Sequence, residues 1–224
     1  MANPTVRGRF VWHELYTPNA AGARDFYTKT VGWTVEAWDR DPTYRMFAAK
    51  SGPLGAAVEE RSGTPQWLAY IGTTDVDATA DAAARLGGRV QTAPANLPDG
   101  RRYAVLVDPQ GARFGVHASA SVPQPEKSPS AGEFSWHELA TNVAPGAAFG
   151  FYAALFDWDL VDEFDMGPQG KYLIFGRHGR QIGGVFDQTA SGKVGTAYWL
   201  GYVSVTDLEG TVERAKAARS RLRE

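Results

Sequence analysis

The sequence contains no cysteine, and this absence excludes several kinds of site at once. A chain without thiols forms no disulfide, no cysteine metal site and no thiol nucleophile. Its 23 lysine and arginine residues stand against 25 acidic ones, so it has no basic excess to hold nucleic acid or an anionic membrane surface. Residues 1–4 do not begin a secretory leader pattern, and no run approaches about 18 apolar residues. The sequence therefore predicts a cytoplasmic protein with neither nucleic-acid nor membrane partners.

What the chain does contain is a long internal repeat. The phrase Trp-His-Glu-Leu occurs at residues 12–15 and again at 136–139. Further pairs follow in the same order: Phe26-Tyr27 and Phe151-Tyr152, Gly32-Trp33 and Asp157-Trp158, Leu54-Gly55 and Ile182-Gly183, and Trp67–Tyr70 and Trp199–Tyr202. The spacing between equivalent residues grows slowly along the chain, as small loop insertions would make it. A repeat of this length predicts two copies of one domain.

The predicted elements place two βαβββ modules in the first copy, which is an α+β pattern. The first module has a strand over 9–16, a helix over 20–31 with Asn19 as its N-cap, and short strands at 33–39, 44–50 and 54–60. The second module has a strand over 67–73, a helix that Asp75 caps and Gly87 ends, and strands near 89–93, 102–108 and 112–118.

The repeat divides the chain into two domains. The first spans 1–118, with modules at about 9–60 and 66–118, and a proline- and serine-rich linker follows over 119–132. The second spans 133–224 and is expected to be truncated in its fourth module, because too few residues follow Asp207 to form three closing strands. An incomplete sheet has an open edge, which a homodimer partner could cover.

These motifs resemble those of the vicinal oxygen chelate superfamily, which includes glyoxalase I, bleomycin-resistance proteins and extradiol dioxygenases. The matching segments are Ala23–Tyr27, Val31–Trp33, Leu86–Gly88 and Asp108–Gly115 in the first copy, and Phe149–Tyr152 and Phe156–Trp158 in the second. The chain looks most similar to tandem glyoxalase-like proteins that are labelled as hydroxylases. The resemblance implies a U-shaped mixed sheet in each domain, with outer helices and a ligand cavity. In metal-using members a divalent ion is held there by histidine and glutamate, which suit such ions.

The resemblance places metal ligands on the first and last strands of each module. Three of these positions fall on Trp12, Leu68 and Gly115, which do not bind metals. In the second copy the first-strand positions fall on Trp136 and Leu200. We therefore expect no family metal, and a divalent ion at an atypical place is the alternative.

Strand alternation decides which side chains could line the cavity. If Trp12 faces it, Glu14 does too and His13 faces the helices, while a register shift of one residue would exchange the two sets. Glu14 and Glu138 either accept a proton or hydrogen bond from a ligand, or are held by Arg113 or a tyrosine hydroxyl. For the histidines of the repeated phrase, the favoured interpretation is an imidazole wedged between strand and helix and bonded to a backbone carbonyl.

The aromatic residues of the strands favour either a core or a cavity for a flat organic ligand. His117 shares a strand face with Gly115 and is expected to contact the ligand. The predicted ligand-binding residues are Trp12, Glu14, Leu68, Tyr70, Arg113, His117, Trp136 and Glu138, with Glu14 as the catalytic candidate.

Two functions follow from these residues. The favoured one is a glyoxalase-like protein that binds a flat organic molecule without the family metal. The alternative is a lyase, isomerase or dioxygenase that uses either a metal ion or Glu14 or His117 as a general base. The sequence does not decide whether the protein is an enzyme.

Overall fold

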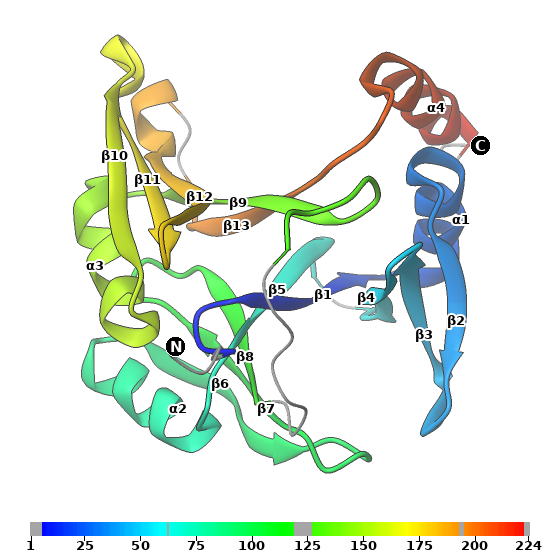
Figure 1. Cartoon of the computed structure of the whole chain (residues 1–224), viewed down its shortest axis with the longest axis horizontal. Coiled ribbons are helices and arrows are strands. Elements are labelled where there is room, and N and C mark those ends of the chain that lie inside the picture. The colour runs from blue at the N-terminus through cyan, green and yellow to red at the C-terminus, as the bar shows by residue number, and fades with distance from the viewer. Residues whose placement is uncertain (1–5, 62, 119–126, 193–194, 222–224) are drawn as a thin grey trace. The chain divides into compact units, whose positions relative to one another are not determined.

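The computed structural model describes residues 6–61, 63–118, 127–192 and 195–221 (Figure 1). The strands before the predicted linker are β1 (Phe10–Thr17), β2 (Thr34–Trp38), β3 (Asp41–Ala49), β4 (Gly52–Glu59), β5 (Gln66–Gly72), β6 (Arg89–Asn96), β7 (Arg102–Val107) and β8 (Arg113–Ala118). Those after it are β9 (Phe134–Thr141), β10 (Asp159–Asp165), β11 (Lys171–Arg177), β12 (Arg180–Asp187) and β13 (Tyr198–Val203). The helices are α1 (Ala20–Val31), α2 (Val76–Arg85), α3 (Pro145–Phe156) and α4 (Leu208–Arg221), with short 3-10 turns at Gly167–Gln169 and Gln188–Ser191.

The strands form two open mixed sheets, which confirms the predicted α+β class. The eight-stranded sheet has the order β2-β3-β4-β1-β5-β8-β7-β6, and the five-stranded sheet has the order β10-β11-β12-β9-β13. In the first three modules the opening strand pairs in parallel with the last strand of the same module: β1 with β4, β5 with β8, and β9 with β12. One sheet therefore contains the described strands before the predicted linker and the other those after it. Residues 119–126 of that linker lie outside the described part of the chain.

The predicted boundaries hold for α1 but not for β3. The sequence reads Asp39–Pro42 as a break, whereas β3 begins at Asp41, which pairs with Trp38 across a tight hairpin. Proline lacks an N–H and is tolerated near the start of a strand where no ladder bond is needed. The β4 pairing of this strand begins only at Met46, and Pro42 is exposed, so the proline interrupts nothing.

Contacts group the chain into two compact units, which we describe separately. The first unit consists of residues 1–11, 69–126 and 136–201, and the second consists of residues 12–68, 127–135 and 202–224. These boundaries differ from those of the repeat, whose division into domains 1–118 and 133–224 remains a prediction.

The core of the first unit contains a buried polar network at Tyr152 of α3. Its hydroxyl donates to Asp108 Oδ2 at 2.9 Å and accepts the indole N–H of Trp199 at 3.0 Å. Asp108 Oδ1 accepts the backbone N–H groups of Gln110 and Ala112 in the turn between β7 and β8. Burial raises the pKa of both Asp108 and Tyr152. The tight turn predicted at Asp108–Gly111 is thus bonded directly to the helix layer.

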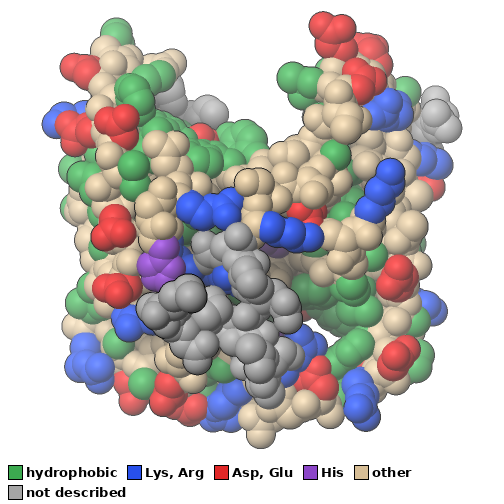
Figure 2. Space-filling view, in the orientation of Figure 1, with side chains coloured by type: hydrophobic (Ala, Val, Ile, Leu, Met, Phe, Trp, Pro, Cys, Tyr) green, Lys and Arg blue, Asp and Glu red, His purple; other side chains and the backbone are tan. Residues whose placement is uncertain are grey.

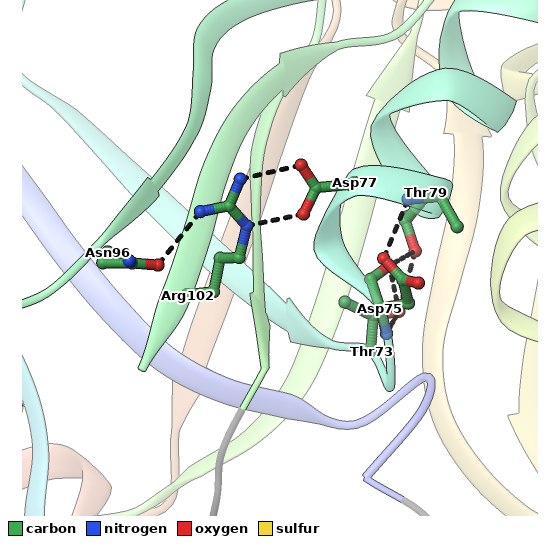
Figure 3. Close-up of polar contacts among 7 residues, drawn as sticks. Thr73, Asp75, Asp77, Thr79, Asn96 and Arg102 are labelled. Atoms are coloured by element: carbon green, nitrogen blue, oxygen red, sulfur yellow. Dashed lines mark hydrogen bonds and ion pairs between the residues drawn. The ribbon is translucent and has the colours of Figure 1, made fainter. Parts of the chain in front are cut away.

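The start of α2 is held by its own cap and by the β6–β7 hairpin (Figure 3). The Asp75 side chain accepts the N–H of Ala78 at 2.9 Å, as an N-cap residue does. Arg102 of β7 donates two hydrogen bonds to Asp77 and one to Asn96 Oδ1. A guanidinium suits such paired contacts because its donors form a planar fork.

The second unit is built on an aromatic core between α1 and the strands. Trp33 and Phe47 are fully buried, and Tyr27 of α1 contacts both rings. The Trp33 indole N–H donates to the carbonyl oxygen of Gly132 at 2.7 Å. Helices α1 and α4 lie side by side (Figure 1), and Arg214 of α4 donates to the carbonyl oxygen of Thr30.

Strand β10 is an edge strand in which all seven residues are exposed. Acidic side chains are interspersed along it with exposed apolar ones such as Leu160 and Phe164. Acidic and hydrophobic side chains lie near one another at the upper left of Figure 2. Charge on an edge strand discourages pairing with another sheet. Among the described residues, no helix is long and apolar enough to cross a membrane.

Replacing Tyr152 with phenylalanine is expected to destabilise the protein by about 1–3 kcal/mol. The change removes a hydrogen-bond partner from both Asp108 and Trp199 inside the core. The urea midpoint followed by circular dichroism would measure the loss, with Phe164→Leu at an exposed position as the control. Equal midpoints for Tyr152→Phe and the unmodified protein would contradict this account of the core.

Candidate functional site

The two faces of β1 have different surroundings. On one face His13 and Leu15 are buried, and the His13 ring stacks on Phe134 at 3.6 Å. On the other face Glu14 accepts a hydrogen bond from Tyr44 of β3. Phe47, three residues after Tyr44 on the same strand, contacts Tyr27 of α1 and so lies on the α1 side of the sheet. Because side chains alternate along a strand, Glu14 and its partners lie on the sheet face opposite α1.

Five side chains on this face form what we call the Glu14 cluster: Trp12, Glu14, Tyr16, Trp38 and Tyr44. The Tyr44 hydroxyl donates to Glu14 Oε1 at 2.5 Å and accepts the indole N–H of Trp12 at 3.0 Å. The Tyr16 hydroxyl donates to Glu14 Oε2 at 2.7 Å. The Trp38 ring meets the Tyr44 ring edge-on with 5.9 Å between centroids. The carboxylate is only 9% exposed, whereas the four rings are half-buried.

Electrostatics keep the phenol of Tyr44 in its donating form. Burial raises the pKa of Tyr44 far above its ordinary value, and the adjacent charge of Glu14 raises it further. A protonated phenol can donate a hydrogen bond to the carboxylate, whose two oxygens can accept about four hydrogen bonds in all. Of the two alternatives for Glu14, the structure shows the carboxylate bonded to tyrosine hydroxyls.

The second copy repeats the central part of this arrangement within the first unit. The Tyr172 hydroxyl donates to Glu138 Oε1 at 2.6 Å and accepts the Trp136 indole N–H at 3.0 Å. A Cβ on Gly184 would overlap the Tyr172 hydroxyl, so glycine at this position lets the ring lie across β12. The position of Tyr16 is taken by Ala140, which has no hydroxyl to offer.

The histidines of the repeated phrase are packed against aromatic rings. His13 Nδ1 lies 3.4 Å from the carbonyl oxygen of Leu54, to which it can donate, and His137 stacks on Phe10 at 3.6 Å. Burial lowers the pKa of His13 to about 3. Its neutral imidazole therefore acts as part of the packing, as the favoured interpretation held. His178 lies exposed in the turn between β11 and β12 with a φ of 51°.

The remaining predicted residues lie on β5 and β8. Leu68 and Tyr70 are buried, and Tyr70 of β5 pairs with Gly115 of β8. His117 is also buried, and burial together with the nearby charge of Arg101 lowers its pKa to about 4. Arg113 is half-buried at the start of β8. The part of these four residues in ligand binding remains a prediction.

The positions that the family uses for metal ligands do not suit a metal here. A Cβ on Gly115 would overlap the ring of Tyr70, so no ligating side chain fits there unless that ring moves. The Trp12 indole N–H is a donor already directed to Tyr44, and Leu68 is a buried hydrocarbon. Within the described ranges, no group of three or more histidine, cysteine or acidic side chains is placed to hold a metal ion. The residues present therefore do not fit the family metal at its usual place.

The tyrosines that hold the two acids were missed in the sequence. Tyr44 and Tyr172 occupy equivalent places in the repeat, each three residues before the matching Phe47 and Phe175. Extending the repeat to this strand would have found them. Tyr16 and Trp38 have no repeated counterpart and gave no such signal.

Protein stability is expected to fall as pH drops from about 6.5 towards 4. The unfolded chain takes up protons on His13 and His117 in this window, whereas the folded chain keeps both imidazoles neutral until about pH 3 and 4, respectively. Stability is therefore fully present above pH 6.5 and is lost on acidification, by up to about 1.4 kcal/mol per pH unit for each histidine.

Urea unfolding at several pH values would test this expectation. His13→Gln should reduce the slope of stability against pH, whatever its effect on stability at pH 7, because glutamine does not titrate. Identical slopes for His13→Gln and the unmodified protein would show that His13 is not kept neutral by burial.

Comparison with known proteins identifies relatives of the chain. Residues 9–116 match the model of the family described as Glyoxalase/Bleomycin resistance protein/Dioxygenase superfamily. The anthracycline biosynthesis protein DauV of Streptomyces sp. (strain C5) is 36% identical over 227 residues, an alignment that covers 93% of this chain and 81% of DauV. The Mycobacterium tuberculosis protein CFP32, which carries the name of a glyoxylase, is 39% identical over 113 residues and is matched over 43% of its length, by 49% of this chain.

A solved structure shows the shared fold. The Mn(II)-bound glyoxalase from Novosphingobium aromaticivorans superposes with a TM-score of 0.61 at 15% identity, over 95% of this chain and 71% of that one. The fold, the family-model match and the extent of the similarity to DauV together show that the chain belongs to the Glyoxalase/Bleomycin resistance protein/Dioxygenase superfamily.

Proposed function

We propose that this protein binds a flat organic molecule at the Glu14 cluster, without the family metal. The carrying observation is the arrangement of half-buried rings around a buried carboxylate on the sheet face opposite α1. Aromatic rings provide large contact area at little conformational cost, and a few polar groups among them orient a ligand. The cluster offers both kinds of group within one unit.

The repeat supports this proposal. The indole–phenol–carboxylate chain occurs on β1 and β3 and again on β9 and β11. Burying an acid lowers the stability of a fold unless hydrogen-bond donors surround the carboxylate. Two apolar side chains in place of the acid and the tyrosine would pack the same strands without this cost. The persistence of the same three polar groups in both copies fits a binding role better than packing alone.

The name of one relative suggests a chemical class for the ligand. DauV is named for anthracycline biosynthesis, and anthracyclines are flat, polycyclic and aromatic. A molecule of this shape matches the rings of the Glu14 cluster. We therefore take a planar aromatic compound as the ligand class and daunorubicin as the probe.

An enzymatic role is the second candidate, because Glu14 is a buried carboxylate among the rings of the cluster. A carboxylate in such a place can accept a proton from a bound substrate. If the cluster acts as a general base, Glu14→Gln abolishes turnover and leaves affinity largely intact. If it acts only in binding, the same change lowers affinity and there is no turnover to lose.

Daunorubicin is expected to bind the unmodified protein with quenching of its fluorescence, and Trp12→Leu should weaken binding about tenfold. The change removes the aromatic surface next to Tyr44, and contacts of this kind contribute about 1 kcal/mol beyond their buried area. Phe164→Leu, on exposed strand β10, should bind like the unmodified protein. Equal affinities for Trp12→Leu and the unmodified protein would place the ligand elsewhere.

Isothermal titration calorimetry with nickel, zinc, manganese or ferrous ions should give no stoichiometric sub-micromolar binding. The expectation rests on Gly115, Leu68 and Trp12 at the positions where relatives hold the ion. Tight binding of one ion per chain would overturn it and favour the metal-dependent alternative.

A further inference from the structure

We infer that the outer edge of β10 is a docking site for a basic, extended segment of a partner protein, which adds a strand to the five-stranded sheet. The inference is independent of the proposed function, because it uses none of the residues of the Glu14 cluster. Strand β10 lies wholly within the first unit, and Figure 1 shows it beside β11 at the border of its sheet.

The first argument concerns the backbone of β10. The strand pairs with β11 from Asp159 to Asp165, and the sheet order gives it no other neighbour among the described strands. A strand at the border of a sheet directs a row of N–H and C=O groups outward, where another strand can pair with them. A bulge between Leu160 and Asp162 interrupts the ladder, so the regular part that a partner meets is Asp162–Asp165. Addition of a strand to such an edge is a recurring mode of peptide recognition.

The second argument concerns the apolar side chains of this edge. Four large ones expose between 45% and 52% of their surface within a short stretch: Leu160, Val161, Phe164 and Met166. No other stretch of the same length in the described part of the chain has as many exposed large apolar side chains. Apolar surface that gathers in one place on a protein commonly marks an interaction site, because covering it removes it from water.

The two edge strands of the eight-stranded sheet show how this chain protects an edge. Strand β2 is only five residues long, and Val35 is its one exposed large apolar side chain. Strand β6 contains Pro94, which has no N–H to offer to another strand. Short length and proline both keep an edge from pairing. Strand β10 is longer than β2, lacks proline and keeps its apolar side chains exposed, so protection alone does not account for its composition.

The third argument concerns charge, which identifies the partner. Strand β10 carries four acids, and Lys171 of β11 bonds to one of them, Glu163, at 2.5 Å. Asp159 and Asp162 form no ion pair with any residue that the structure describes. Two β10 strands placed side by side would bring like charges together, which disfavours a second copy of this chain as the partner. Lysine or arginine side chains opposite these acids are attracted instead.

The register of β10 indicates the pattern of the partner segment. Successive side chains point to opposite faces, so Glu163 and Asp165 share one face of the sheet, while Asp162 and Phe164 share the other. A complementary strand carries basic residues on the first face and apolar residues, with or without a further base, on the second. Alternation of basic and apolar residues satisfies this pattern.

Three synthetic peptides with blocked ends would test the inference on the whole chain. The first alternates lysine and valine, the second alternates glutamate and valine, and the third has the lysines of the first with proline at its central valines. Proline keeps the charge of the peptide but prevents strand pairing. We expect the lysine–valine peptide to bind at least about tenfold more tightly than either of the others at low ionic strength, with the preference shrinking as salt is added.

Amide hydrogen exchange would locate the peptide on the unmodified protein. Binding of the lysine–valine peptide should slow exchange in β10 and leave β2 unchanged, because outward N–H groups are protected only where a strand is added. This measurement needs no variant. Protection of other strands without β10 would contradict the inference.

Variants of β10 would separate the contributions of charge and apolar contact. Asp162→Lys combined with Asp165→Lys should lower the affinity for the lysine–valine peptide at least about tenfold, and Phe164→Ser should lower it several-fold. Glu36→Lys, at an exposed acid on edge strand β2, is the matched control and should bind like the unmodified protein. Circular dichroism would establish that each variant is folded.

The remaining outcomes each overturn the inference. Equal binding of the proline-containing peptide would mean that charge alone attracts it, and equal binding by the double lysine variant would place the peptide elsewhere. If the lysine–valine peptide does not bind, β10 is no docking site for a basic strand. Dimerisation of Asp162→Asn combined with Asp165→Asn in sedimentation would then identify a second copy as the occupant. Daunorubicin binding, which tests the proposed function, is unaffected by any of these results.

Discussion

The hydrogen bond from the Tyr44 hydroxyl to Glu14 is the interaction on which this site depends. It connects β1, which carries the first Trp-His-Glu-Leu phrase, to β3, which lies on the far side of β4 in the sheet. This bond is possible because successive side chains of β1 point to opposite faces of the sheet. Glu14 therefore points away from α1, while His13 lies among the core rings. A register shift of one residue would bury the acid against the helix and expose the imidazole. The surrounding core of Trp33 and Phe47 disfavours such a shift.

Duplication accounts for much of the molecule, and divergence accounts for its asymmetry. Both copies keep the tryptophan, the tyrosine and the acid, with equivalent hydrogen bonds at nearly equal lengths. The first copy adds Tyr16 and Trp38, whereas the second has Ala140 and an acidic edge strand. Packing alone does not require both copies to retain an acid at this position. In the second copy the Phe186 ring stacks on Tyr172, where the first copy has Val58, so the two copies have diverged in the rings that surround the shared groups.

Much of the fold could be predicted from the sequence, and the site only in part. Asn19, Asp75 and Gly32 are local signals, and the structure has α1 and α2 where they predicted helices. The phase of β1 followed from alternation once Trp12 was assumed to face the ligand. Tyr44 could not be assigned from local pattern, because its contact with Glu14 crosses 30 residues and an intervening strand. Pro42 suggested a break that the structure lacks, because it lies before the part of β3 that pairs with β4, where its missing N–H costs that pairing nothing.

A crystal structure of the protein with daunorubicin, grown in the presence of manganese, tests the central claim most directly. The account predicts the ring system against Trp12 and Tyr44 of the Glu14 cluster, with no ion bound beside it. A manganese ion coordinated by side chains at this place, or a ligand bound away from the Glu14 cluster, would contradict it.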